Sequence, residues 1–206
     1  MTSLILLLIS FIFLIAYVLI TTFIYNQDNV DNFSYFNHFP YEIYIKRGHK
    51  NALLNILLFL VGLSFATNYI LHAIFNFSVM EIFIAFVSVV VAFSFIAIFY
   101  LPLSKLKERC LCSILFFVSN IGLNALITIN DIRIIKIYEN NLGYISLVIS
   151  LLILIICILF IFNPKLFDFC LEKKDEQTVR PKIFYLAFGE WMLIYIFLFS
   201  QIYLYL

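Results

Sequence analysis

The chain has 206 residues, of which 65% are hydrophobic and only 12% are charged. This composition leaves too little polar surface to cover a water-soluble globule, so it excludes a soluble globular protein and indicates that the bilayer is the solvent. The formal net charge is only +1, and we expect no nucleic-acid partner.

Six apolar runs divide the chain, and each is close to the roughly 20 residues that a helix needs to cross about 30 Å of hydrocarbon. They cover residues 3–25, 52–73, 80–101, 110–129, 143–162 and 183–206. The longest connections are too short for a separate soluble domain. We therefore predict an all-α polytopic integral membrane protein, a bundle of six transmembrane helices that forms one domain over residues 1–206. The first run lacks a basic n-region, so we interpret it as an uncleaved helix.

The Lys and Arg residues are distributed unevenly among the connections. Of the thirteen, the first, third and fifth connections carry three, three and five, the fourth carries two, and the tails carry none. Under the positive-inside rule this predicts cytoplasmic basic connections and an N-out/C-out orientation. Abundant Phe, Ile, Asn, Tyr and Lys are typical of an AT-rich genome, and we infer a bacterial plasma membrane, the cytoplasmic or inner membrane.

The first connection changes from polar to aromatic and then to basic residues. Its basic cluster is Lys46, Arg47 and Lys50. Aromatic rings favour the membrane interface and basic side chains attract anionic headgroups, so we predict a lipid-headgroup anchor, with a ligand-gating loop as the alternative. In the fifth connection, Asn163 and Pro164 could begin a short amphipathic turn in the membrane plane.

Two predicted helices carry polar residues on one face. Ser64, Asn68 and His72 recur every four residues in the second run, and Asn120 and Asn124 do so in the fourth. Buried amides commonly hydrogen-bond between helices, and we favour that interpretation. Two alternative interpretations of these polar faces are a polar permeation path and a pocket for a lipid or small ligand.

Glu190 is the only carboxylate well inside a run, and we select it as the best single functional candidate. An ionised carboxylate at that depth requires a cation or several donors. His72 and Glu81 flank a short connection, close enough in sequence to meet. We expect a simple hydrogen bond there, with a pH-sensitive pair or half of a metal site as alternatives.

Enzymatic signatures are missing from the sequence. It contains no H-E-x-x-H, G-x-S-x-G, P-loop or C-x-x-C motif. We expect no catalytic residue, no cofactor and no metal, and we interpret the four cysteines as small hydrophobic residues rather than a disulfide framework.

In size and composition the chain resembles small multi-pass proteins of AT-rich Gram-positive bacteria, some of which serve in immunity or secretion. We therefore predict a non-enzymatic protein acting through interaction, as a subunit or accessory of a membrane assembly or as an immunity-type protective protein. The expected partners are membrane lipids and either another membrane protein or a protein at the cytoplasmic face. A small transporter or channel along the second, fourth and sixth helices is the alternative, and an intramembrane enzyme ranks third.

Overall fold

The computed structural model describes residues 2–28, 32–44, 52–102, 105–138, 141–163, 165 and 183–205. Every regular element within these ranges is helical. Five long helices are continuous: α1 (Thr2–Asp28), α2 (Ala52–Asn76), α3 (Val79–Tyr100), α4 (Leu106–Tyr138) and α5 (Asn141–Ile161). The sixth is α7 (Tyr185–Ile196), which continues directly as the 3-10 helix η5 (Phe197–Tyr205). All six are long and apolar enough to cross a membrane, which confirms the predicted all-α architecture.

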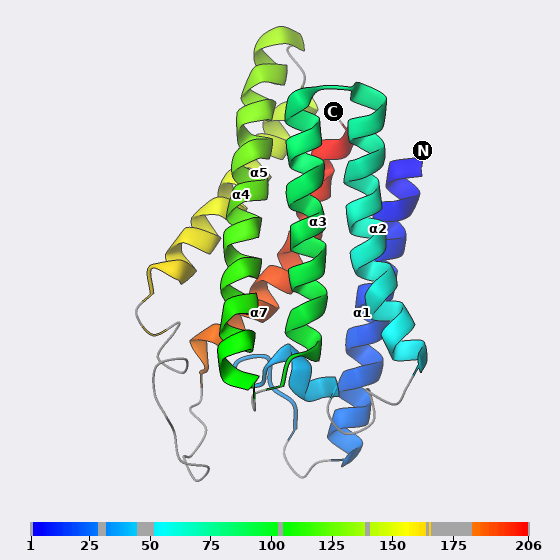
Figure 1. The fold of residues 1–206 in the computed structure, drawn as a ribbon, viewed down its shortest axis with the longest axis vertical. Coiled ribbons are helices and arrows are strands. Elements are labelled where there is room, and N and C mark those ends of the chain that lie inside the picture. The colour runs from blue at the N-terminus through cyan, green and yellow to red at the C-terminus, as the bar shows by residue number, and fades with distance from the viewer. Residues whose placement is uncertain are drawn as a thin grey trace.

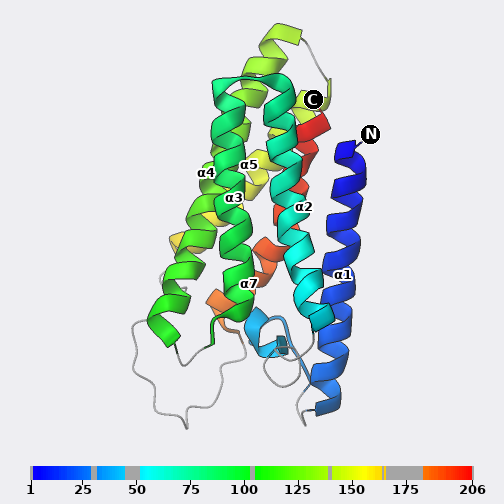
Figure 2. The ribbon, with the colours of Figure 1, turned by 45° about the vertical axis from the view of Figure 1, so that its right-hand side comes forward.

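The helices run alternately up and down, so the two termini lie at the same end of the bundle (Figure 1). We call this the terminal end. The opposite end is here the basic end, because the connections that carry most of the Lys and Arg residues begin and end there. Consecutive helices from α1 to α5 pack side by side, while η5 contacts α1, α2, α4 and α5 (Figure 2). The C-terminal segment therefore forms the centre of the bundle.

Helix α4 is much longer than the apolar run that predicted it, with 33 residues instead of the 20 in residues 110–129. The apolar run marks only the middle of the helix. The backbone hydrogen bonds of the helix continue past it at both ends, over residues with charged and amide side chains, because many such residues are compatible with a helix. Arg109, which we had assigned to the third connection, is consequently inside α4 and fully buried. Asn130 and Asp131 are likewise helical and buried.

The first connection contains a short 3-10 helix, η1 (Pro40–Tyr44), that enters the bundle. It contacts α1, α3 and α7. Phe39 and Tyr41 expose only 1% and 5% of their surface, so this part of the segment is core and not the headgroup-level layer that we had expected. Lys46, Arg47 and Lys50 lie outside the described residues, and the lipid-headgroup anchor stays a prediction. Most of the fifth connection is also outside them.

Candidate functional site

A buried ion pair connects α4 to α7 at the basic end. Arg109 Nη2 donates to Glu190 Oε2 at 2.5 Å, and Ser113 Oγ, one turn further along α4, donates to Glu190 Oε1 at 2.5 Å. All three side chains are completely buried. The candidate carboxylate therefore has both the cation and the donors that its depth requires, and we call this group the basic-end cluster.

Arg109 also holds two other segments. Its Nη1 donates to the carbonyl oxygens of Ile98 and Leu101, both at 2.9 Å, where α3 ends. Carbonyls at a helix C-terminus have no partner within the helix, so a guanidinium satisfies them well. The Arg109 Cζ atom lies 4.6 Å from the ring centroid of Phe39 and 4.9 Å from that of Tyr41. One side chain thus joins α3, α7 and the segment around η1.

Aromatic side chains close the basic end around this cluster. The indole Nε1 of Trp191, the next residue after Glu190, donates to the carbonyl of His38 at 2.8 Å. The ring of Tyr35 lies 5.0 Å from that of Trp191 at an interplanar angle of 85°. Because Trp191 exposes only 1% of its surface, these rings form a plug over the interior.

A second cluster of polar residues lies at the terminal end, around Glu81. Glu81 Oε2 is 3.0 Å from His72 Nδ1, and Oε1 accepts from Asn130 Nδ2 at 3.0 Å and from the hydroxyl of Tyr203. These partners come from α2, α4 and η5. The expected contact between His72 and Glu81 is present, and we call the four residues the terminal-end cluster. Nowhere in the described ranges do three or more His, Cys, Asp or Glu side chains gather as a metal site.

The polar face of α2 binds other helices, as predicted. Asn68 Nδ2 donates to Gln201 Oε1 at 2.7 Å, and the hydroxyl of neighbouring Tyr69 is 2.9 Å from Ser200 Oγ. Ser64 Oγ lies 2.6 Å from Ser10 Oγ of α1. These contacts attach α2 to η5 on one side and to α1 on the other.

The amides of α4 behave differently from this prediction. Asn120 and Asn124 donate to carbonyls of their own helix, those of Phe116 and Asn120, at 2.8 and 2.9 Å. Both are fully buried, and their Oδ1 atoms accept no hydrogen bond from any residue that the structure describes. Interhelical bonding at these two positions was therefore wrongly predicted, while Thr128 does reach Ser150 of α5 at 2.9 Å.

Sequence reasoning missed several members of these clusters and two other buried polar residues, Asp131 and Gln201. Their shared feature is a position at the edge of an apolar run or in the last, 3-10 part of the chain: Arg109, Ser113, Asn130, Asp131, Gln201 and Tyr203. A helical projection of α4 extended beyond the apolar run would have found part of the set, because steps of four and seven residues keep positions 109, 113, 120, 124 and 131 on one face. No comparable signal joins Arg109 to Glu190, which is 81 residues away.

The cysteines give one correction. Cys110 is disulfide-bonded, so its interpretation as a small hydrophobic thiol is wrong. Cys112 and Cys157 are free, and Cys157 is buried, in agreement with that interpretation.

Together these features define a helical protein with six membrane-length apolar helices and a charged cluster near each end of its core. The chain matches no protein-family model, no curated protein and no solved structure. Any assignment of function therefore depends on the geometry alone.

Proposed function

We propose that this chain is a non-enzymatic multi-pass protein of the bacterial plasma membrane that acts through interaction. It would serve as a subunit or accessory of a membrane assembly, or as a protective protein of the immunity type. Its basic end would face the cytoplasm and both termini the outside, because positive-inside charge distribution favours that orientation.

The observation that carries this proposal is the plug at the basic end. Arg109 pairs with Glu190 and donates to two backbone carbonyls, and Phe39, Tyr41 and Trp191 surround the pair with at most 5% exposure. A solute moving through the core would have to break this buried ion pair, which is costly when one charge is left unpaired. The geometry therefore favours a closed, rigid core and a protein that functions by binding partners on the outer faces of its helices.

A groove between α2 and α3 gives those outer faces a binding feature. It has a volume of about 180 Å³ and is lined by the small residues Gly62, Ala66 and Ala92 and by larger side chains such as Phe93. Small residues let the backbones of two membrane helices approach closely, and such positions are typical of helix interfaces. We propose that the occupant is a transmembrane helix of another membrane protein.

Site-specific photocrosslinking in intact membranes tests this assignment. A photoreactive residue at Phe93, which is 67% exposed beside the groove, should give a discrete crosslink to one other membrane protein. The matched control is Leu152 on α5, which is 53% exposed and outside the groove, and it should not give this product. Equal products from both positions, or only lipid adducts at Phe93, would contradict the proposal.

Transport is the second candidate, and the polar face of α4 favours it. This face extends from Arg109 to Asp131, about 33 Å at 1.5 Å per residue, and includes the unpaired Oδ1 atoms of Asn120 and Asn124. Purified protein in liposomes would then pass a small solute or cation, and Glu190→Gln should change the flux. Measurable flux that is the same in both proteins would exclude a transport role for Glu190.

A further inference from the structure

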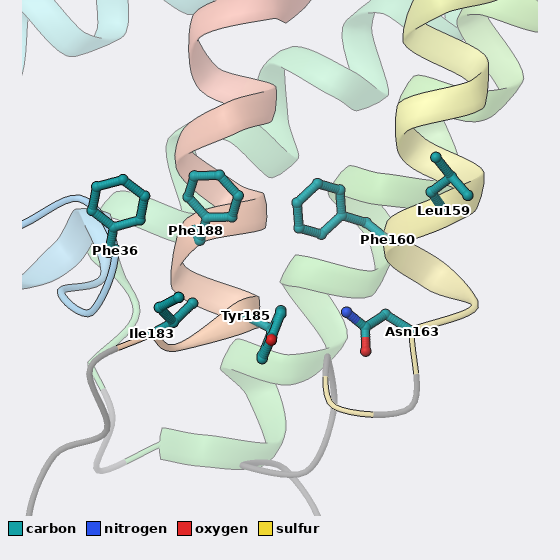
Figure 3. A pocket seen from close by; sticks show the side chains of 7 residues that line it. All are labelled: Phe36, Leu159, Phe160, Asn163, Ile183, Tyr185 and Phe188. Carbon is teal, nitrogen blue, oxygen red and sulfur yellow. The ribbon is translucent and has the colours of Figure 1, made fainter.

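A cavity of about 250 Å³ opens at the basic end between the last turns of α5 and the start of α7. Figure 3 shows the rings of Phe160 and Phe188 next to each other along its wall. Their centroids are 5.8 Å apart, and Phe36 stacks on Phe188 from the other side at 5.3 Å. Leu159, which is 66% exposed, lies at the lipid-facing rim. The deep part of this cavity is therefore apolar and accessible from the side of the bundle.

The polar residues of the cavity lie at its other end, nearer the connections (Figure 3). There the Asn163 side chain faces the ring of Tyr185. Asn163 Oδ1 accepts from the backbone N–H of Lys165 at 3.0 Å, which leaves the amide nitrogen on the cavity side. This order of polar mouth and apolar interior follows the order of headgroup and acyl chain in a phospholipid.

One basic side chain, Lys165, lies near the polar mouth. The Nζ atom of Lys165 lies 5.8 Å from the centroid of the Tyr185 ring, and Lys165 is exposed. The fifth connection, residues 163–182, carries five Lys and Arg residues and four Asp and Glu residues, so its formal charge is only +1. Basic groups near the membrane surface attract anionic headgroups, so Lys165 near the mouth complements a phosphate.

Glycine at position 189 keeps the cavity wall in place. A Cβ atom there would lie 3.0 Å from Phe160 Cδ1 and 2.8 Å from Phe117 Cζ. Because real Cβ contacts are longer than this, any larger residue would push Phe117 and Phe160 away from α7. The close approach at Gly189 thus keeps α5 packed against α7 beside the cavity.

We propose that this cavity binds one anionic phospholipid, with an acyl chain against the wall formed by Phe36, Phe188 and Phe160 and the headgroup phosphate near Asn163, Tyr185 and Lys165. The binding does not depend on the protein partner proposed for the α2–α3 groove, which is on another face. Either proposal can therefore fail without the other.

Native mass spectrometry of the purified full chain tests the site with two added lipids that have identical acyl chains, phosphatidylglycerol and phosphatidylcholine. The wild-type protein should retain one phosphatidylglycerol in preference to phosphatidylcholine. Leu159→Trp should fill the cavity and remove the retained lipid, whereas Leu152→Trp, two turns earlier on the same face of α5, should leave it bound. Equal retention of both lipids, or retention unaffected by Leu159→Trp, would overturn the proposal.

Two further variants separate headgroup recognition from folding. Lys165→Glu should reduce the preference for phosphatidylglycerol by about fivefold or more, and Lys136→Glu at the terminal end should not. Tyr185→Phe removes one hydroxyl from the mouth without changing the ring, so it should weaken the preference in a protein that still folds. Displacement of the lipid by inorganic phosphate would show a phosphate site instead of a lipid site and would also overturn the assignment.

Discussion

The guanidinium of Arg109 meets the carboxylate of Glu190 at 2.5 Å, and both residues are completely buried. The two positions are 81 residues apart in the chain. A buried pair of this kind is weak evidence of stability by itself, because two charges must be desolvated to form it. Once it exists, however, each charge depends on the other, and this dependence can be measured.

Removing one charge of the pair should be worse than removing both. We expect Arg109→Met or Glu190→Met alone to lower the free energy of unfolding by about 3–5 kcal/mol, since each leaves an uncompensated buried charge. The double variant should lose much less than the sum of the single losses. Reversible denaturation of all four proteins in mixed micelles measures the coupling, and additive losses would contradict the inferred dependence.

The single tryptophan reports on the plug at the basic end. Trp191 is buried and contacts Tyr35, so its fluorescence in the wild-type protein should resist quenching by an aqueous ion such as iodide. Tyr35→Ala removes one covering ring and should make Trp191 accessible to the quencher. Phe36→Ala is the control, because Phe36 is already 53% exposed and stacks on Phe188. An increase in quenching of the same size in both variants would argue against the plug.

The six helices could be predicted from the sequence because a long apolar run in a membrane must pair its own backbone N–H and C=O groups, and an α-helix does this within a single segment. The predicted second run begins at residue 52, as α2 does. Arg109 shows where this reasoning stops. Hydropathy places it one residue outside a run, and only the tertiary contact with Glu190 explains its burial.

The candidate site was predictable in part for a related reason. Asn68 was correctly placed on an interhelical face, but its partner Gln201 lies in η5, a 3-10 segment of nine residues. Such segments are uncommon beyond three or four residues, and they turn each side chain by about 120° where an α-helix turns it by about 100°. A projection that assumes α-helix throughout therefore misplaces Gln201 and Tyr203.

Two glycines should differ sharply in their tolerance of a methyl group. Gly189→Ala places Cβ within 3.0 Å of both Phe117 and Phe160, and we expect it to cost about 1–3 kcal/mol through overpacking. At Gly122 the nearest atom to a Cβ is Val87 Cγ1 at 3.8 Å, an ordinary contact, so Gly122→Ala should be neutral or slightly stabilising. Thermal unfolding in detergent compares them, and equal effects would contradict the close approach at Gly189.

The hydrogen bond between Asn68 and Gln201 should carry a modest coupling energy. Interhelical hydrogen bonds in membrane proteins average about 0.6 kcal/mol and reach about 1.7 kcal/mol, since polar groups in the unfolded state also find partners. We expect a double-mutant cycle of Asn68→Leu and Gln201→Leu to fall in this range. A parallel cycle of Asn68→Leu with Thr128→Val, which contacts Ser150 instead, should give a coupling near zero. Equal couplings would mean that the 2.7 Å contact is not the source.

Cys110 is where charge distribution and structure lead to opposite expectations for the cell. The positive-inside rule places the basic end in the reducing cytoplasm, where disulfides are rare, whereas Cys110 is disulfide-bonded in the structure. If the proposed orientation is correct, acid-quenched cells should give four thiols labelled by a maleimide polymer after denaturation, because the chain has four cysteines. A Cys110→Ser variant should then show three. Two labelled thiols without reductant and four with it would place the basic end on the oxidising side and reverse the orientation.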